Sequence, residues 1–312
     1  MNDLVSIIIP TFNRAHFLRQ SLASVKNQTY PNWECLVVDD GSQDETEAML
    51  REISEKDSRF CYLKRPSERK KGAACCRNIG LEKSKGNFIQ YLDSDDTIAP
   101  DKLAVHVGLL KQKDEFSMAT CKWGRFYSKS DKVIVHEQMP TYFSTRHPIE
   151  LLNIFGNTQS YLPVHSYFIT SALSEKAGKW NEHLSNNDDG EYFTRIILNS
   201  SSIHFTNKTS VLYRAGANER LSNLEKRDQV KSYIRGWKII DKTLSSYIKK
   251  NNHSLVKYAA GNLYDKLKNS SNKDLLEKEK EFFSKKRNTS SHYFLKLLYK
   301  LKIWKPLRKI SL

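Results

Sequence analysis

The first hundred residues alternate short apolar runs with segments of helical pattern. The apolar runs of strand length are residues 5–10, 33–38, 60–64 and 88–92. The helical segments between them are residues 16–27, 42–56 and 72–83. Ser42 followed by Glu45 has the spacing of a capping box, which predicts the start of the second helix. Because strands that alternate with helices form a parallel sheet covered on both faces, we predict a doubly wound α/β fold.

The rest of the chain has a less regular pattern. The expected helices are residues 100–113, a segment that includes Arg195 and Ile196, residues 229–250 and residues 255–268. The expected strand pair is residues 116–127 and 132–136. Residues 139–163 show no clear periodicity, and a turn is expected at residues 269–272. We therefore expect strands and helices to alternate in the first half and helices to dominate the last quarter.

Charge divides the chain into two regions. Residues 1–100 carry 14 basic against 15 acidic side chains, and residues 101–225 carry 14 against 13. Residues 226–312 carry 23 against 7, so the whole net charge of +16 lies there. This change of composition predicts a boundary near Leu224, with one domain at residues 1–225 and a basic helical region at residues 226–312.

The cysteines and the apolar runs bear on the cellular compartment. None of the five cysteines has CxxC spacing, and most lie inside apolar runs, which is typical of buried reduced thiols. Adjacent Cys75 and Cys76 are expected to pack in the core. No apolar run reaches the roughly 20 residues of a membrane span, and the first six residues lack the pattern of a signal peptide. We expect a protein on the cytoplasmic side of the membrane.

Polar side chains follow three of the four predicted strands directly. Thr11 to Arg14 come after the first, Asp39 and Asp40 after the second, and Asp93 to Asp96 after the fourth. Ligands of such sheets bind beyond the carboxyl ends of the strands, so these loops should converge. The first loop has no glycine and so lacks the G-x-G-x-x-G fingerprint of dinucleotide sites. Arg77, near the start of a helix, could contact a diphosphate.

Three carboxylates end the fourth apolar run. Asp93, Asp95 and Asp96 are separated only by Ser94, and carboxylates this close repel one another unless a cation or hydrogen-bond donors neutralise them. A divalent metal would do so, because Mg²⁺ and Mn²⁺ prefer oxygen ligands. A solvated acidic turn is the alternative, since Asp and Ser are good turn formers. This stretch alone does not separate the two interpretations.

Four blocks of sequence follow one another in a specific order. They are VSIIIPTFNR, VVDDGSQDET, GAACCRNIGL and FIQYLDSDD. Together they resemble the amino-terminal half of family 2 glycosyltransferases of GT-A fold, although relatives usually have alanine where this chain has Cys76. The resemblance implies a mostly parallel central sheet flanked by helices, with residues 1–100 binding a nucleotide sugar and residues 101–225 binding the acceptor.

The resemblance also assigns residues to the donor site. The residues implied to bind the nucleotide sugar are Pro10, Thr11, Asn13, Arg14, Asp39, Arg77, Asp93 and Ser94. Asp39 would contact uracil or an equivalent base, and Arg77 would approach the diphosphate. Asp93-Ser94-Asp95 would be the D-x-D element, in which Asp95 and Asp93 hold Mn²⁺ or Mg²⁺.

Local structural roles compete with some of these assignments. Asn13 could instead cap the first helix, and Asp40 could begin a turn with Gly41. Asp96 could support a metal ligand without binding the metal itself. The family's Tyr-Arg strand end is matched by Tyr213-Arg214, but Gly216 stands near the place of the histidine that often follows, so a histidine metal ligand is in doubt.

A second acidic pair, Asp188-Asp189, begins the helix that includes Arg195. Acidic groups in a first helical turn are favoured by the helix dipole, which is the structural explanation. Inverting sugar transfer, in contrast, needs a carboxylate base to take the proton of the acceptor hydroxyl. The family has an acidic pair, usually Glu-Asp, at the start of this helix, and the match puts Asp189 on the catalytic base, with Asp188 as the second candidate.

Aromatic and histidine side chains in the middle of the chain are weaker candidates. Tyr161 and Trp180 could stack on sugar faces, although buried aromatics are commoner. His165 is better interpreted as a core or loop histidine than as a ligand.

The last segment predicts contact with a membrane. Residues 293–304 place Tyr293, Leu297 and Trp304 on one helical face, with Lys296 and Lys300 on the other. Basic amphipathic helices with interfacial aromatics bind anionic membranes. Packing of this helix on the catalytic domain is the competing interpretation.

These observations predict an inverting hexosyl- or N-acetylhexosaminyltransferase. It would use a nucleotide sugar, UDP-linked by preference, and a glycan or lipid-linked acceptor at the inner face of the cytoplasmic membrane. One alternative is a haloacid-dehalogenase-like phosphatase that uses Asp93 and Asp95, although that family carries its D-x-D-x-T loop after the first strand. The other is a non-enzymatic polyanion binder, but the charge lies in one tail without a nucleic-acid recognition motif.

Overall fold

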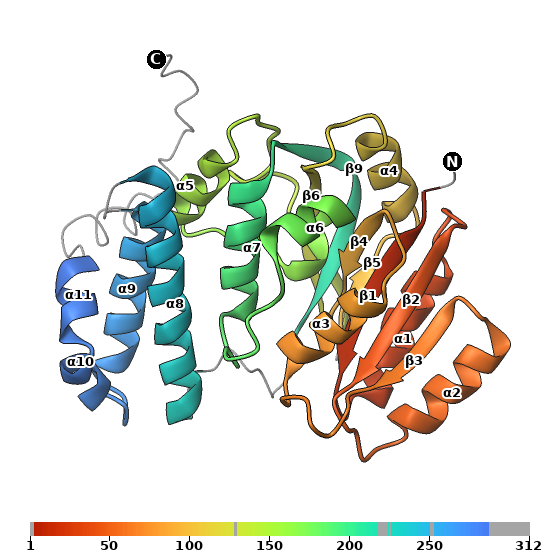
Figure 1. Cartoon of the computed structure of the whole chain (residues 1–312), viewed down its shortest axis with the longest axis horizontal. Helices are drawn as coiled ribbons and strands as arrows, with labels where there is room; N and C mark the ends of the chain where they lie inside the picture. The colour runs from red at the N-terminus through yellow and green to blue at the C-terminus, as the bar shows by residue number, and fades with distance from the viewer. Residues whose placement is uncertain (1–2, 128–129, 217–223, 225, 250–252, 287–312) are drawn as a thin grey trace.

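The computed structural model describes residues 3–127, 130–216, 224, 226–249 and 253–286. Within this part of the chain, one nine-stranded sheet has helices on both sides (Figure 1). The strand order is β3-β2-β1-β4-β8-β6-β9-β5, and β7 pairs with β6 at the side of this path. The predicted strands β1 to β4 therefore form one continuous half of the sheet.

This half is parallel, as the sequence predicts. Its strands are β1 (Val5–Thr11), β2 (Trp33–Asp39), β3 (Phe60–Lys64) and β4 (Phe88–Tyr91). The pairs β1–β2, β2–β3 and β1–β4 are all parallel. The connecting helices are α1 (Ala15–Lys26), α2 (Thr46–Lys56) and α3 (Ala73–Lys83). Because β1 is buried along its whole length, it occupies the centre of the core.

The other half of the sheet is mixed. Its strands are β5 (Thr97–Ile98), β6 (Ser117–Tyr127), β7 (Ser130–Val135), β8 (Phe168–Thr170) and β9 (Ser202–Ala215). The short strand β8 runs antiparallel to both β4 and β6, whereas the long strand β9 is parallel to β6. The predicted pair β6–β7 is present and antiparallel. The doubly wound pattern therefore holds only for the first four strands.

Several helices cover this second half. They are α4 (Lys102–Leu110), α5 (Ile149–Thr158), α6 (Ser171–Ala177) and α7 (Asp188–Asn199), with a 3-10 turn η1 (Val164–Ser166). Helix α5 lies inside residues 139–163, where the sequence predicted a less regular chain and no specific helix. Leu151, Leu152 and Phe155 form its buried stripe, a short signal that is interrupted by Asn153 and Gly156.

The described part of the basic region is helical, as predicted. It consists of α8 (Arg227–Ile248), α9 (Ser254–Leu267), α10 (Asp274–Lys278) and α11 (Lys280–Lys286), with turns between Leu267 and Asp274. Figure 1 shows α8 beside α7, and the two helices are in contact, as are α5 and α9. Val230 and Ile234 of α8 are buried in the same core cluster as the sheet. The predicted helix at residues 293–304 lies outside the described residues.

Two further expectations concern cysteines and membrane spans. Cys35, Cys75, Cys76 and Cys121 are buried free thiols, and Cys61 is half-buried. Within the described ranges, no helix has the length and apolarity needed to span a bilayer.

Candidate active site

The loops after β1 and β2 are joined by hydrogen bonds. The backbone N of Asn13 donates to Ser42 Oγ at 2.8 Å, and the backbone N of Gln43 donates to Asn13 Oδ1 at 2.7 Å. Asn13 therefore does not cap α1. Asp44 does this instead, because its Oδ2 accepts from the backbone N of Ala15 at 3.1 Å. The convergence of these loops that the strand order implies is present in the structure.

Asp39 and Asp40 end β2 with different partners. Asp39 is fully buried, and its Oδ1 accepts from the backbone N and the Oγ of Ser42, at 3.0 and 2.5 Å. Ser42 is thus used by Asp39, α2 begins only at Thr46, and the predicted capping box is wrong. Asp40 is buried in an ion pair with Arg65, the residue directly after β3. The predicted role of Asp40 as a simple turn residue misses this ion pair.

Pro10 and Thr11 are the last two residues of β1. Both are buried, and Thr11 Oγ1 has no hydrogen-bond partner among the described residues. A buried hydroxyl without a partner is costly in a folded protein, so a bound ligand could satisfy it.

The acidic turn after β4 is neutralised by two arginines. Arg14 donates to Asp95 Oδ2 at 2.8 Å, and Arg77 donates to Asp93 Oδ1 at 2.7 Å. Both carboxylates remain partly exposed, whereas Ser94 is buried. Burial and the neighbouring Asp93 raise the pKa of Asp95, and the charge of Arg14 opposes this. The two arginines therefore supply hydrogen-bond donors of the kind that the sequence predicts for carboxylates this close together.

Asp96 has a structural place in this turn. It is buried, and its Oδ1 accepts from the backbone N of Arg214 on β9 at 2.7 Å. Its Oδ2 lies 3.2 Å from Nδ1 of His165, whose pKa burial lowers to about 4. His165 is fully buried, in keeping with a core histidine. Arg214 also donates from Nε to the backbone O of Asp95 at 2.8 Å, so the Tyr213-Arg214 strand end holds the acidic turn in place.

The carboxylates of the turn limit what metal could bind. Within the described residues, no group of three His, Cys, Asp or Glu side chains is placed to hold a metal ion. Asp93 and Asp95 provide two carboxylates, and a histidine is absent near Gly216 in the sequence. Mg²⁺ sites often use one or two carboxylates and take their other ligands from phosphates and water. The donor set fits a cation of this kind and does not fit a closed structural site.

Arg77 joins the two acidic segments. Its guanidinium donates to Asp93 on one side and to Asp188 Oδ2 on the other, at 2.7 and 2.8 Å. Arg77 is buried, and its Cζ lies 4.4 Å from the centroid of the Trp180 ring. The acidic residues after β4 and those at the start of α7 therefore face one another across one cation, as the sequence requires for a common site.

Asp188 and Asp189 have different environments. Burial raises the pKa of Asp188, and the adjacent Arg77 opposes this. Asp189 accepts from the backbone N of Gly190 at 2.8 Å, and desolvation by the surrounding protein, followed by the charge of Asp188, raises its pKa to about 6. Because Asp189 is exposed at the surface, water offsets part of this desolvation, and the upward direction is the chemically relevant result. Asp189 is thus a solvent-accessible carboxylate that is more basic than usual.

The aromatic residues near this pair belong to the core. Trp180 is buried and stacks on Tyr192 with ring centroids 4.1 Å apart, so it does not offer a face to a sugar. Tyr161 is exposed and lies against Trp123, at 5.0 Å between centroids. Of the two sugar-stacking candidates, the geometry leaves only Tyr161 accessible.

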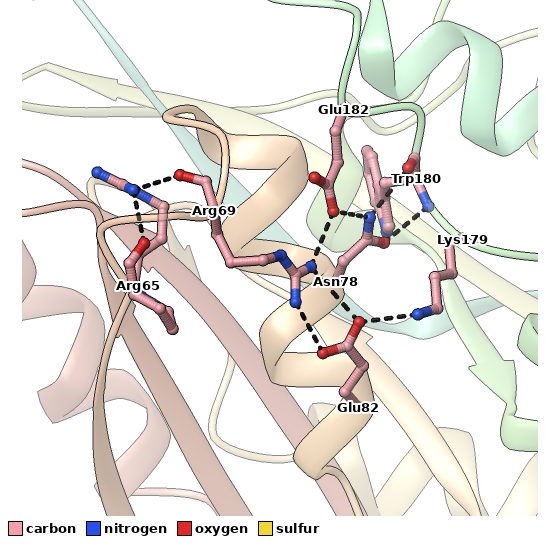
Figure 2. A network of polar contacts seen from close by, with 8 residues as sticks. Arg65, Arg69, Asn78, Glu82, Lys179, Trp180 and Glu182 are labelled. Carbon is pink, nitrogen blue, oxygen red and sulfur yellow. Dashed lines mark hydrogen bonds and ion pairs between the residues drawn. The ribbon is translucent and has the colours of Figure 1, made fainter.

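Sequence reasoning missed a polar network that includes Asn78, the residue after Arg77 in the chain (Figure 2). Arg69 pairs with Glu82 and Glu182, at 3.2 and 3.0 Å. Asn78 donates to the backbone O of Trp180 at 3.0 Å and to Glu182 at 2.8 Å. The network ties α3 to the segment that leads into α7. Arg65 also belongs to this network, because it donates to the backbone O of Arg69 at 2.6 Å. Its position directly after β3 is the one feature of the sequence that could have indicated a role at the end of the sheet.

A model of the family described as "Glycosyl transferase family 2" matches residues 6–175, more than half of the chain. The chain belongs to this family. The glycosyltransferase is therefore an enzyme, and the phosphatase and non-enzymatic alternatives are set aside.

Two curated relatives illustrate the family. The glycosyltransferase is 45% identical over 111 residues to Escherichia coli WfgD, a UDP-Glc:alpha-D-GlcNAc-diphosphoundecaprenol beta-1,3-glucosyltransferase, in a match that covers 35% of this chain and 42% of WfgD. It is 29% identical over 234 residues to the uncharacterised glycosyltransferase RP339 of Rickettsia prowazekii, covering 73% and 70% of the two chains. Several relatives are matched over less than half of their own length.

Solved structures show the same fold. TarS 1–349 of S. aureus, in complex with UDP-GlcNAc, superposes with a TM-score of 0.59 at 16% identity, over 96% of this chain and 92% of TarS. The mannosyltransferase PcManGT of Pyrobaculum calidifontis, in complex with GDP-Man and Mn²⁺, gives 0.56 at 17% identity, over 97% and 81%. The glycosyltransferase therefore has the GT-A fold, as the sequence predicts.

Proposed function

We propose that this enzyme transfers a hexosyl or N-acetylhexosaminyl group from a UDP-sugar to a hydroxyl of a glycan or lipid-linked acceptor, with inversion at the anomeric carbon. The observation that carries the proposal is the bridge of Arg77 between Asp93 and Asp188. The bridge supports the proposal because Asp93 is a candidate donor-binding residue and Asp188 is adjacent in the chain to the candidate base, Asp189. The names of TarS in complex with UDP-GlcNAc and of WfgD support a UDP-sugar donor.

The nucleotide would occupy the joined loops after β1 and β2. Asp39 is the proposed acceptor of hydrogen bonds from the base, in a loop that Asn13 and Ser42 hold together. Pro10, Thr11, Arg14 and Ser94 would line the same site. The unpartnered hydroxyl of Thr11 supports this assignment, because a bound nucleotide could provide its missing partner.

The diphosphate would lie near the acidic turn and Arg77. Arg77 is a buried cation, so its charge is little screened by water and can stabilise the negative charge of the departing nucleoside diphosphate. Asp95 and Asp93 would hold Mn²⁺ or Mg²⁺, as the Mn²⁺ in the PcManGT complex suggests. When bound, such a cation would neutralise charge on the diphosphate.

Asp189 is the proposed base. It would accept the proton of the acceptor hydroxyl while the acceptor oxygen forms a bond to the anomeric carbon. The bond between that carbon and the diphosphate oxygen breaks, and the nucleoside diphosphate leaves with the electron pair. Asp188, held by Arg77, is less free to accept a proton. The raised pKa of Asp189 makes it a stronger base that is still ionised at neutral pH.

A membrane-bound acceptor would explain the basic carboxyl-terminal region. WfgD is named for a diphosphoundecaprenol-linked acceptor, and the net charge of this enzyme lies entirely in residues 226–312. We place the enzyme on the inner face of the cytoplasmic membrane, attached peripherally through residues 293–304.

A donor screen tests the proposed activity. The full chain is incubated with UDP-, GDP- and dTDP-sugars and Mn²⁺, and release of the nucleoside diphosphate is measured. We expect release from a UDP-hexose or UDP-N-acetylhexosamine that is lost with EDTA and in Asp95→Asn. Asp228→Asn, at an exposed carboxylate of α8, is the matched control and should keep the activity. Lack of release from every donor would contradict the proposal.

A further inference from the structure

Helix α8 contacts the segment that carries the acidic pair. Ser232 of α8 is buried, and its Oγ accepts from the backbone N of Ser185 at 2.8 Å and from that of Asn186 at 3.2 Å. These two amides lie in the segment just before α7, where hydrogen bonds within a helix cannot satisfy them. The Ser232 hydroxyl, on a helix beyond residue 225, therefore fixes the backbone just before the Asp188-Asp189 pair.

Asn187 forms the second contact with α8. Its backbone has φ of +62°, in the left-handed region, and the residue is buried. A Cβ at Gly236 of α8 would lie 2.9 Å from Asn187 Nδ2 and 3.2 Å from its Cβ. A Cβ at Gly190 would lie 2.3 Å from Asn187 Oδ1. The Asn187 side chain thus fills a space that glycines on both helices leave open.

Gly236 lowers the stability of helix α8, and the packing of Asn187 explains why a glycine is found there. Glycine in the interior of a helix is less stable than alanine by about 1 kcal/mol. Gly236 lies well inside the 22-residue helix α8, where nothing in its own backbone calls for glycine. The close approach of Asn187 accounts for the glycine, because a methyl group at this position would make the Asn187 side chain shift, and Asn187 directly precedes Asp188.

We propose that Ser232 and Gly236 are positioning residues for the Asp188-Asp189 pair, and that α8 is a working part of the transferase site. They hold the backbone at residues 185–187, and this sets where Asp188 meets Arg77 and where Asp189 projects. Both residues lie outside the stretch that matches the family model. Tyr233, also on α8, lies close enough to Asp189 for the charge of that carboxylate to act on it: burial and the charge of Asp189 both raise the pKa of Tyr233. The inference rests on the proposed function of Asp189 as base.

Two pairs of variants test this inference. Ser232→Ala removes the hydroxyl, and Ser246→Ala makes the same change at an exposed site of α8. Gly236→Ala adds the methyl group next to Asn187, whereas Gly108→Ala adds one in a helix where nothing lies within 4 Å. Hydrogen exchange of peptides that cover residues 184–190 reports on the loop, and donor turnover and UDP affinity report on the site.

The expected results separate positioning from general stability. Ser232→Ala and Gly236→Ala should speed exchange at residues 184–190 and lower kcat at least tenfold, with UDP affinity changed less than twofold. Ser232→Thr, which keeps the hydroxyl, should recover much of the lost kcat. The two control variants should match the wild type. A second change, Asn187→Gly, should remove most of the additional effect of Gly236→Ala, because the clash is then absent.

Two results would overturn the inference. One is unchanged exchange at residues 184–190 in Ser232→Ala. The other is faster exchange with an unchanged kcat, because α8 would then stabilise the loop without affecting the chemistry. A wild-type enzyme that is inactive with all donors would instead fault the proposed function, and the exchange measurement would still decide whether α8 holds this loop.

Discussion

At the residue scale, the site depends on a buried arginine with carboxylates on two sides. A buried guanidinium loses its hydration and is stable only if carboxylates compensate. Arg77 has Asp93 and Asp188 as such partners. The sequence indicated both carboxylates, because Asp93 directly follows the fourth apolar run and the family resemblance assigned Asp188 to an acidic pair at the start of a helix. The partners of Asp39 and Asp40 were not assigned from the sequence, although Ser42 lies three residues after Asp39 and Arg65 directly follows β3.

Replacement of Arg77 should destabilise the fold. Arg77→Met leaves Asp93 and Asp188 without their buried cation, and loss of one partner from a buried ion pair costs about 3–5 kcal/mol. We expect the free energy of unfolding, measured with urea, to fall by that amount. Arg51→Met removes an exposed helix pair with Glu47 and should change it by less than about 1 kcal/mol. Equal effects of the two substitutions would show that the bridge has no special stabilising role.

The activity should fall at acidic pH. Asp189 must be ionised to accept a proton, and its pKa is raised to about 6. As the pH falls through this range, Asp189 becomes protonated and can no longer act as a base. Below the pKa of Asp189, kcat should therefore decrease about tenfold for each pH unit. A pH profile of kcat at saturating donor checks this. A profile that stays flat down to pH 4.5 would argue against Asp189 as the base.

At the element scale, the length of the apolar pattern separates the elements that the sequence predicts from those it misses. Strands β1 to β4 and helices α1 to α3 carry long, clear patterns, and the structure confirms them. Strand β8 has three residues and exists because β4 and β6 both pair with it. Helix α5 was missed because its apolar stripe is short. It matters for the fold, because α5 packs against α9.

Gly156 should be intolerant of a side chain. A Cβ at this position of α5 would lie 2.3 Å from the backbone N of Leu255 at the start of α9, and backbone atoms cannot move aside cheaply. Gly156→Ala should lower the free energy of unfolding by about 2–3 kcal/mol. Gly108→Ala, at an open helical position, should leave it equal or raise it by up to about 1 kcal/mol. If Gly156→Ala has no effect, α9 does not pack on α5 as described.

At the scale of the whole molecule, the carboxyl-terminal helices are linked to the catalytic region and also differ from it. All of the net charge of +16 lies in residues 226–312. The domain boundary near Leu224 that this charge distribution suggests stays a prediction. In the described residues, α8 contacts α7 and α9 contacts α5. Periodicity predicted these helices, but the contacts of α8 with residues 185–187, just before the acidic pair, had no signal in the sequence, because Ser232 and Gly236 match no motif.

Membrane attachment should depend on the last segment. We expect the full chain to sediment with liposomes that contain anionic lipid, and to do so less at high salt. A chain that ends at Asn288 lacks residues 293–304 and should remain mostly in the supernatant. Liposomes of neutral lipid are the control for the contribution of charge. Equal partitioning of the two chains would refute attachment through this segment.

The central claim is that Asp189 removes the proton of the acceptor at a site where Arg77 and the acidic turn hold the donor. The measurement that tests it most directly compares wild type with Asp189→Asn in two assays, sugar transfer and UDP binding by calorimetry. We predict that transfer falls by about 10²–10⁴-fold while the Kd for UDP stays within twofold. Transfer that continues at the wild-type rate in Asp189→Asn would contradict the account.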